Sequence, residues 1–322
     1  MRINPFNDLY ASCNTGSGPD KLTGLPDGPR IIDLELTSFC NMRCVMCPTG
    51  LQALGRPGVF MTPKTFKAIL HKTKPFKTAL RFIGWGEPTM HWALPDFVRD
   101  ATVQGRLTHL NTNGSKLAVD PLYLRRLLNA GLSSIKFSFQ GTDRESYTAM
   151  RRVDFFEELL TAIERVKRAR GESPRPFIAA STTTTTESPE QIAAFAERVA
   201  PLVDQLTIGR TVFDFIDFSV VPEKRRELLL AAAANQSVER RHPDPCPEVY
   251  DKLSIHADGS ARVCCNDYSG HTYLGNIVTE PLDAIWRSPV LAAYRERLAA
   301  GRYEGPLCSV CYDYMELTEG AA

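Results

Sequence analysis

Residues 39–48 have the sequence Phe-Cys-Asn-Met-Arg-Cys-Val-Met-Cys-Pro, which places cysteines at positions 40, 44 and 47. The apolar run Ile31–Leu36 just before it is expected to form a β-strand, so the three thiols lie on a loop at the end of that strand. Three cysteine ligands suit a [4Fe–4S] cluster that leaves one iron open, whereas a structural zinc ion requires a fourth ligand. No cysteine or histidine is close enough in sequence to be that ligand. The spacing therefore predicts an iron–sulfur site formed by Cys40, Cys44 and Cys47.

The remaining cysteines also indicate metal binding. The chain of 322 residues has nine cysteines, which is many for a cytoplasmic protein, where disulfides are rare. Only Cys13 stands alone, and five others gather near the end of the chain, at positions 246, 264, 265, 308 and 311. Two groups with ligand-like spacing favour metal ligation over scattered buried thiols that act as small hydrophobes.

The composition sets limits on partners and compartment. With 43% hydrophobic and 23% charged residues, the chain suits a large globular domain and a small one. Its formal net charge of +1 predicts no broad surface for nucleic acid. The longest apolar run, 228–234, is too short to span a bilayer, and the N-terminus has no apolar signal segment. We therefore expect a cytoplasmic protein that binds neither nucleic acid nor membrane.

Short apolar runs alternate with amphipathic stretches from residue 30 to about residue 215. Such alternation predicts right-handed βαβ units and a parallel sheet, the pattern of an α/β fold. The expected strands are Ile31–Leu36, Ala79–Gly84, Leu107–Asn111, Ser134–Phe139, Phe177–Thr186 and Gln205–Gly209. Six strands are too few to close an eight-stranded barrel, so we expect an open, partial (β/α)6 barrel.

The Cys-x3-Cys-x2-Cys pattern at the end of a first strand resembles that of the radical S-adenosylmethionine (SAM) superfamily, and the resemblance runs through the whole predicted barrel. It implies that the open iron binds the amino and carboxylate groups of SAM, whose reductive cleavage yields a 5′-deoxyadenosyl radical that abstracts hydrogen from the substrate. It also implies an electron donor such as flavodoxin or ferredoxin. The family usually has an aromatic residue before the third cysteine. Here that residue is Met46, whose thioether can pack in its place.

Further segments resemble the SAM contacts of this family. Gly84-Trp85-Gly86-Glu87-Pro88 is similar to its Gly-Gly-Glu-Pro strand end, which holds the SAM ammonium. Residues at the ends of the third and fourth strands resemble ribose and carboxylate contacts, although turn chemistry alone would also explain their Asn-Gly and Gln-Gly pairs. The implied SAM-binding residues are Gly84, Trp85, Gly86, Glu87, Asn113, Ser138, Gln140 and Arg151.

The C-terminal cysteines resemble a second cluster site. Asp258-Gly259 predicts a two-residue hairpin turn between strands 253–255 and 261–263. The arrangement is similar to the SPASM/twitch domains of radical SAM enzymes, and without cysteines after position 311 it matches the shorter, twitch-like form. The resemblance implies an auxiliary [4Fe–4S] cluster with four ligands, although zinc would also suit two cysteine pairs. The implied ligands are Cys246, Cys264, Cys308 and Cys311.

These observations divide the chain into four segments. We expect an irregular N-terminal extension over residues 1–28, rich in Gly, Pro, Asn and Asp, and the radical SAM partial barrel over residues 29–220. A helix and a stiff linker then occupy residues 221–245, followed by the small cysteine-rich SPASM/twitch domain over residues 246–322.

Cys265 is not needed as a ligand, although it follows directly after Cys264. In SPASM relatives the residue at this place can face the substrate, where an acid serves as a base for dehydrogenation. A thiol has a weak S–H bond and can instead return a hydrogen atom to a carbon radical, as the resemblance to aminoglycoside epimerases of the superfamily implies. The alternatives are that Cys265 is merely buried, or that Asp267 acts as a base.

The leading hypothesis is a radical SAM epimerase that inverts a carbinol carbon of a small-molecule substrate, an aminoglycoside or amino sugar. The second is a twitch-type dehydrogenase that oxidises an aminocyclitol or sugar hydroxyl to a ketone. A peptide-modifying maturase ranks lower, because the N-terminal extension is too short for a peptide-recognition domain. Outside enzymology, a scaffold that uses metal only for folding remains open.

Overall fold

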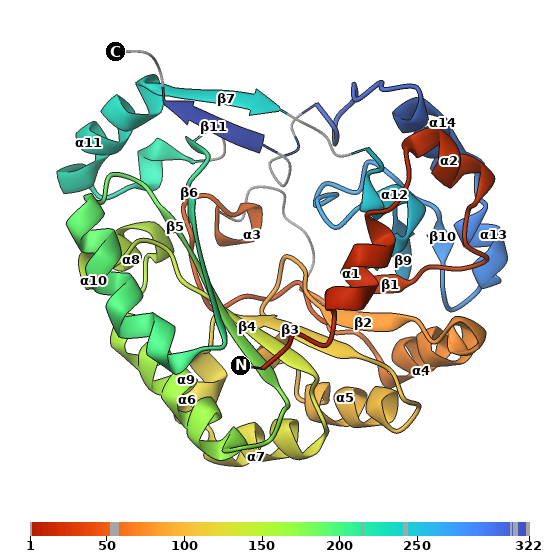
Figure 1. Ribbon diagram of the computed structural model, residues 1–322, viewed down its shortest axis with the longest axis horizontal. Coiled ribbons are helices and arrows are strands. Elements are labelled where there is room, and N and C mark those ends of the chain that lie inside the picture. Colours follow the sequence, from red (N-terminus) through yellow and green to blue (C-terminus); the bar gives the residue numbers. More distant parts are fainter. Residues whose placement is uncertain are drawn as a thin grey trace.

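A nine-stranded sheet organises the computed structural model, which describes residues 2–51, 58–213, 216–240, 244–309, 311 and 315–319 (Figure 1). Six consecutive parallel strands form its main part, in the order in which they occur along the chain. They are β1 (Ile31–Leu34), β2 (Ala79–Phe82), β3 (Thr108–Thr112), β4 (Ser134–Ser138), β5 (Phe177–Thr184) and β6 (Gln205–Arg210). The predicted α/β partial barrel is therefore confirmed.

Helices cover the outer face of this sheet (Figure 1). They are α4 (Pro63–Lys72), α5 (Leu94–Thr102), α6 (Ser115–Val119), α7 (Pro121–Asn129), α8 (Arg144–Arg151), α9 (Phe156–Arg170) and α10 (Pro189–Val199), while the short α3 (Pro48–Leu51) follows the cysteine loop. Apolar side chains of the strands and helices form the core between them, where Phe66 and Phe97 stack with ring centres 4.2 Å apart. No helix of the described residues combines the length and apolar character needed to cross a membrane.

The C-terminal segment extends the same sheet. β8 (Lys252–Ile255) pairs in parallel with β1, and the hairpin predicted at Asp258-Gly259 leads to β9 (Ser260–Arg262). β10 (Gly275–Asn276), α12 (Pro247–Tyr250), α13 (Leu282–Trp286) and α14 (Pro289–Ala299) complete this part. Gly259 has φ +86°, a conformation that suits glycine in such a turn. Because one sheet runs through both parts, the loop after β9 lies beside the barrel strands.

The N-terminal extension is not irregular, contrary to expectation. It contains α1 (Asn7–Cys13) and α2 (Gly18–Thr23), and Ser17 and Asp20 form a capping box at the start of α2. Phe6 is fully buried in a cluster that includes Ile31 and Ala79, the first residues of β1 and β2. The extension therefore packs under the amino ends of the barrel strands and is part of the folded core.

The segment 221–245 also differs from the expected helix and linker. The helix is present as α11 (Glu223–Ala234), but it leads into β7 (Gln236–Arg240), which pairs antiparallel with β11 (Met315–Glu319). This two-stranded sheet joins segments far apart in sequence, so no local pattern indicated it. Residues 241–243 of the expected linker lie outside the described residues.

Candidate active site

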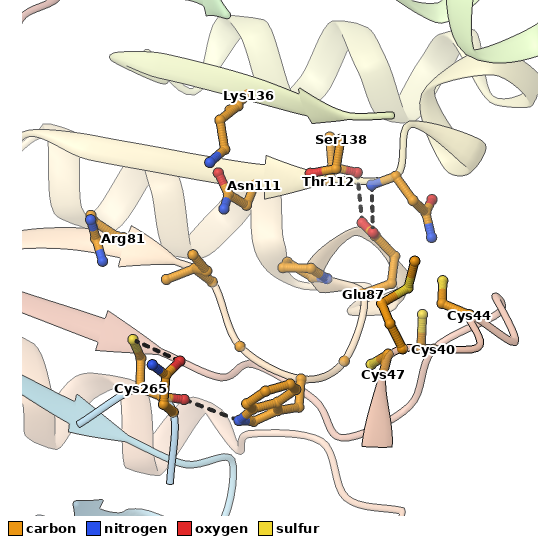
Figure 2. A pocket seen from close by; sticks show the side chains of 18 of the residues that line it. Cys40, Cys44, Cys47, Arg81, Glu87, Asn111, Thr112, Lys136, Ser138 and Cys265 are labelled. Atoms are coloured by element: carbon orange, nitrogen blue, oxygen red, sulfur yellow. Dashed lines mark hydrogen bonds between the residues drawn. The ribbon is translucent and has the colours of Figure 1, made fainter. Parts of the chain in front are cut away.

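One cavity of about 650 Å³ lies between the barrel strands and the C-terminal part (Figure 2). All eight predicted SAM-binding residues line it, together with Cys40, Cys44, Cys47 and Cys265. Met46, at the position usually aromatic, lines it as well. The cavity therefore brings together segments from four strand ends and from the turn after β9.

The cysteine loop is held by the end of α8. The backbone N–H groups of Arg43 and Val45 donate to the carbonyl groups of Arg151 and Met150, at 3.3 and 3.0 Å. Arg151 also donates from Nη1 to Cys44 Sγ at 3.4 Å. Burial raises the pKa of the Cys40 thiol to about 12, so this group is neutral until a metal displaces its proton.

The hydrogen bonds of Arg151 show whether this site fits an anionic cluster and SAM. Its Nη2 donates to the carbonyl groups of Ser138 and Phe139, at 2.9 and 3.1 Å. Its buried Nε has no partner among the described residues, so a donor remains for a bound carboxylate. Three thiols beside a half-buried guanidinium match the donor set that an open [4Fe–4S] cluster and the SAM carboxylate require.

Glu87 connects the second and third strand ends. Its Oε1 accepts hydrogen bonds from Thr89 N–H and from the hydroxyls of Thr89 and Thr112. Its Oε2 accepts one from Asn113 N–H at 2.8 Å. Figure 2 shows the bond between Glu87 and Thr112. With a single donor, Oε2 keeps capacity for a bound ammonium. Gly86 is required for this packing, because a Cβ there would lie 1.9 Å from the Thr37 carbonyl oxygen.

Two further predicted SAM contacts, Asn113 and Gln140, also form hydrogen bonds with protein groups. The Asn113 side chain donates to Asn41 Oδ1 and accepts from Ser115 N–H, at 2.8 and 3.0 Å. Gln140 donates to Thr183 O and Thr211 Oγ1, at 3.1 and 2.7 Å. Both therefore shape the cavity wall, whereas Ser138 lines it from the end of β4.

Cys265 lies across the cavity from the early cysteines (Figure 2). Trp85 Nε1 donates to the Cys265 carbonyl at 3.0 Å, and its ring contacts Tyr268 edge-on with centres 5.3 Å apart. The tryptophan that stands in place of the first glycine of the family's Gly-Gly-Glu-Pro pattern thus holds the turn that carries Cys265.

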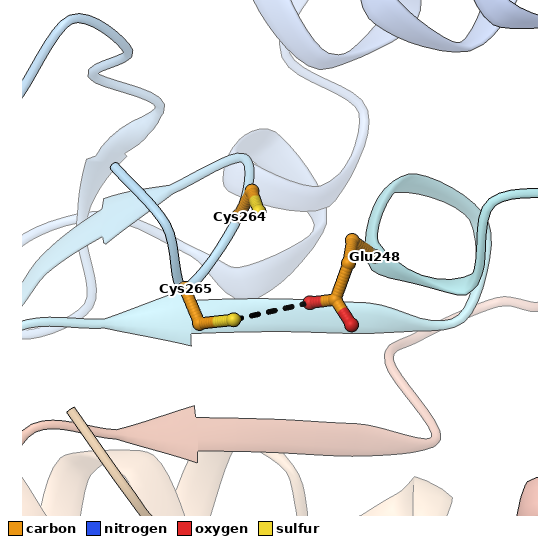
Figure 3. A group of neighbouring side chains, drawn as sticks. All are labelled: Glu248, Cys264 and Cys265. Atoms are coloured by element: carbon orange, nitrogen blue, oxygen red, sulfur yellow. Dashed lines mark hydrogen bonds between the residues drawn. The ribbon is translucent and has the colours of Figure 1, made fainter. Parts of the chain in front are cut away.

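Glu248 is an acid of this cavity that the sequence analysis missed. It is 6% exposed, and one carboxylate oxygen forms an ion pair with Lys252. The other oxygen accepts a hydrogen bond from Cys265 Sγ at 3.8 Å (Figure 3). The ligand atoms of Glu248, Cys264 and Cys265 lie within 4.8 Å of one another. Asp267, in contrast, is fully buried, and its carboxylate accepts from His271 and Thr272, so it does not line the cavity.

The four predicted auxiliary ligands gather outside this cavity. Asn266 links two of them, because its backbone N–H donates to Cys264 Sγ at 3.3 Å and its amide to Cys311 Sγ at 3.9 Å. Arg297 donates to Cys308 Sγ at 3.8 Å, and burial raises the pKa of the Cys246 thiol. N–H donors directed at sulfur fit ligands of an iron–sulfur cluster.

These sulfur atoms do not form a compact zinc site. Four thiolates on one zinc ion lie about 3.8 Å from one another, given Zn–S bonds of roughly 2.3 Å. Among the described residues, the group that gathers its ligand atoms within 4.8 Å is that of Glu248, Cys264 and Cys265, and not the four predicted ligands.

A row of polar side chains on the inner face of the sheet was also missed. Register places Asp33, Arg81, His109 and Ser134 opposite one another on β1 to β4. Asp33 binds Arg81 through two bonds of 2.5 and 2.6 Å. His109 Nε2 bonds Asn111 Oδ1 at 2.9 Å, which can only accept, so Nε2 carries the hydrogen and Ser134 Oγ donates to Nδ1 at 2.7 Å.

The state of His109 predicts a pH dependence of stability. Burial, followed by the charge of Arg81, lowers the pKa of His109 from 6.5 to about 3. Between these values the unfolded chain binds a proton that the folded chain does not, so stability falls as the pH drops through this window. When the pH is lowered from about 7.5 to 5.5, the free energy of unfolding of wild type should fall by about 1.4 kcal/mol more than that of the His109→Gln variant. Urea unfolding at both pH values measures this difference. Equal losses of unfolding free energy in the two proteins would contradict a His109 that stays neutral in the folded chain.

A partial barrel with a three-cysteine loop at its first strand end and a second cysteine group beside it defines an iron–sulfur enzyme that binds SAM. The pattern of the radical SAM superfamily matches residues 34–209, and that of SPASM, an iron–sulfur cluster-binding domain, matches residues 246–312. The chain belongs to the radical SAM superfamily. Its two domains imply SAM and iron–sulfur clusters as cofactors.

Relatives and solved structures agree with this assignment. GTP 3′,8-cyclase of Chlorobaculum tepidum is 32% identical over 142 residues, which cover 42% of this chain but only 40% of the cyclase. The structure of BtrN in complex with AdoMet and 2-DOIA has a TM-score of 0.54 at 18% identity, over 88% of this chain and 92% of BtrN. Streptococcus suis SuiB bound to S-adenosylmethionine has a TM-score of 0.64 at 14% identity, over 92% of this chain and 74% of SuiB. At these identities the structures show a shared fold.

Proposed function

We propose that this protein is a radical SAM epimerase that inverts a carbinol carbon of a small carbohydrate-like substrate, with Cys265 as the hydrogen-atom donor. The observation that carries the proposal is that Cys265 lines the same cavity as Cys40, Cys44 and Cys47, on its opposite side. A substrate between them would be accessible from two faces, which inversion requires.

The assignment of ligands belongs to the same proposal. Cys40, Cys44 and Cys47 would hold the SAM-binding cluster, and Arg151 and Glu87 would contact the SAM carboxylate and ammonium. The auxiliary cluster would be held by the group Cys246, Cys264, Cys308 and Cys311. When bound, SAM at the first cluster supplies a radical that removes a hydrogen atom from one face of the substrate carbon.

The residues of this chain would complete the inversion. Cys265 would give the hydrogen atom of its S–H bond to the opposite face of the carbon, which forms the new C–H bond. Its sulfur would then take up one electron from an external donor such as flavodoxin or ferredoxin, and one proton from solvent. Trp85 holds the Cys265 carbonyl and so fixes the direction from which the thiol approaches.

The acids of the cavity support epimerisation over dehydrogenation. A dehydrogenase requires a base at the substrate hydroxyl, and Asp267, the sequence-based candidate, is buried with both carboxylate oxygens bonded. Glu248 does line the cavity, but its two carboxylate oxygens contact Lys252 and the Cys265 thiol. A cavity of about 650 Å³ suits a small molecule beside SAM, which also supports a small-molecule substrate over a peptide.

Product mass and solvent isotope test the proposal. Anaerobically reconstituted protein is incubated in D2O with a reductant, SAM and candidate sugar phosphates, sugar acids and aminoglycosides. An epimerase gives a product that carries one deuterium at the inverted carbon and is otherwise unchanged in mass. Loss of two mass units would establish the dehydrogenase instead, and a product without deuterium would exclude a solvent-exchangeable thiol as donor.

Trp85→Phe tests the positioning of the thiol. Phenylalanine keeps a ring against Tyr268 but cannot donate to the Cys265 carbonyl, and such a bond contributes about 1.4 kcal/mol. We expect about tenfold less inverted product per 5′-deoxyadenosine formed, with unchanged iron content. Trp92→Phe is the matched control, because Trp92 is 64% exposed and lies outside the cavity. An equal ratio in the Trp85→Phe variant and wild type would show that this bond does not position Cys265.

A further inference from the structure

Asn111 is a polar residue of the cavity that the SAM assignment does not use. It lies on β3, is half-buried, and lines the cavity from the barrel side (Figure 2). Asn113 and Gln140 line the same cavity, but their amide N–H groups donate to other protein groups. Within the described part of the chain, the hydrogen bond of the Asn111 side chain is one that its Oδ1 accepts. Its amide N–H2 therefore differs from those of its two neighbours.

A chain of hydrogen bonds along the sheet sets the orientation of this amide. Ser134 Oγ donates to His109 Nδ1 at 2.7 Å, and His109 Nε2 donates to Asn111 Oδ1 at 2.9 Å. Burial, followed by the charge of Arg81, lowers the pKa of His109 to about 3, so the ring is neutral and carries a single N–H. Because Oδ1 accepts from within the sheet, the group that Asn111 offers to the cavity is its N–H2.

Arg81 adds a second donor on the neighbouring strand. It lines the cavity from β2, and register places it opposite His109. Bonds from Nε and Nη2 to Asp33 hold its guanidinium and balance its charge. Its Nη1 forms no hydrogen bond with another residue that the structure describes. Two adjacent strands thus carry N–H donors at this wall, and the Arg81–Asp33 pair adds no net charge to it.

We propose that the Asn111 amide donates a hydrogen bond to a neutral oxygen of the substrate, a hydroxyl or a carbonyl group, and that His109 is the positioning residue that orients this amide. The inference rests on the proposed function in taking this cavity as the substrate site. A protonated amine has no lone pair with which to accept such a bond. The part of the substrate that meets Asn111 is therefore an oxygen-bearing carbon of a sugar or cyclitol ring and not an amino-bearing one.

Calorimetric titration of the reconstituted protein with SAM bound tests the donor. The probes are scyllo-inositol and scyllo-inosamine, which differ by the replacement of one hydroxyl by an amine. Asn111→Leu keeps the size of the side chain but has no donor, and should weaken scyllo-inositol binding by about tenfold. Asn111→Asp presents a carboxylate oxygen, and should shift the ratio of the two dissociation constants by about tenfold in favour of scyllo-inosamine. Asn129→Leu is the control, because Asn129 is exposed at the end of α7 outside the cavity, and it should bind both probes as wild type does.

The role of His109 is tested by its tautomer and by a double-mutant cycle. Heteronuclear NMR of the imidazole nitrogens in wild type should show the hydrogen of His109 on Nε2. His109→Leu should weaken scyllo-inositol binding about as much as Asn111→Leu does. The variant with both substitutions should show little further loss, because the two residues act through one bond. A hydrogen on Nδ1, or losses that add in full, would overturn the positioning role.

Three results would overturn the donor: no saturable binding of scyllo-inositol to wild type, equal binding by the Asn111→Leu variant, or an unchanged ratio in the Asn111→Asp variant. Failure of the donor can be told apart from failure of the proposed function. Cys265→Ala should bind scyllo-inositol as wild type does, because Asn111 lies on the barrel wall and Cys265 on the turn after β9 (Figure 2). Probe binding that depends on Asn111, without thiol-dependent inversion, would leave the Asn111 site standing and remove the epimerase. Thiol-dependent inversion that Asn111→Leu leaves unchanged would do the reverse.

Discussion

Cys265→Ala protein should cleave SAM to 5′-deoxyadenosine at nearly the wild-type rate but release almost no inverted product. The substitution removes the S–H bond that lines the cavity and leaves Cys40, Cys44 and Cys47 untouched. The first hydrogen abstraction then proceeds while the return step has no donor. We expect inverted product per SAM cleaved to fall on the order of 100-fold, equivalent to about 2.7 kcal/mol, measured by chromatography of both products.

Two further variants make this result specific. Cys265→Ser keeps the size of the side chain, but its O–H bond is too strong to give a hydrogen atom, so it should fail as alanine does. Cys13→Ala removes a thiol that is 1% exposed in α1 and does not line the cavity, and it should invert normally. Normal inversion by the Cys265→Ala variant would show that the donor is another group.

The parts of the site that could be predicted from the sequence lie in contiguous motifs. The cysteine loop and the Gly84–Pro88 segment each carry their chemistry within ten residues, and each follows an apolar run that forms a strand. Carboxyl ends of neighbouring parallel strands lie at one edge of a sheet, so placing the strands was enough to bring these motifs together. The order of six parallel strands followed from the same alternation.

The row of polar side chains on the inner face of the sheet was missed because its residues meet only through strand register. Arg81 is a single charge within Ala-Leu-Arg-Phe, and only its alignment with Asp33 and His109 shows that these side chains form one row. A signal was nonetheless present. Side chains alternate across a strand, so Lys136, two residues before Ser138, had to share the face of that predicted cofactor contact.

Glu248 and the pairing of β7 with β11 had no such local signal. Glu248 lies two residues after Cys246 on the short helix α12, and it faces the cavity because β8 joins the barrel sheet beside β1. The strand pairing depends on contacts between segments about 75 residues apart, which neither composition nor periodicity reports.

Cys40→Ala should lower the iron content from about eight to about four per chain and abolish the formation of 5′-deoxyadenosine. The first site has only three thiols, so two remaining ligands would no longer hold a cluster whose fourth iron is open. The auxiliary site is separate, with its four cysteines outside the cavity, and should keep its iron. Iron and sulfide counted after anaerobic reconstitution, with SAM cleavage on the same samples, give the measurement.

The reciprocal variant makes the comparison decisive. Cys246→Ala should also hold about four irons, yet it should still cleave SAM, because the cysteine trio and Arg151 are intact. Cys13→Ala should keep about eight, since no described contact joins Cys13 to either cysteine group. If the Cys40→Ala variant kept all its iron, or if reconstituted wild type bound zinc at the early thiols, the open-cluster site would be disproved, and with it the hydrogen abstraction that Cys265 is proposed to complete.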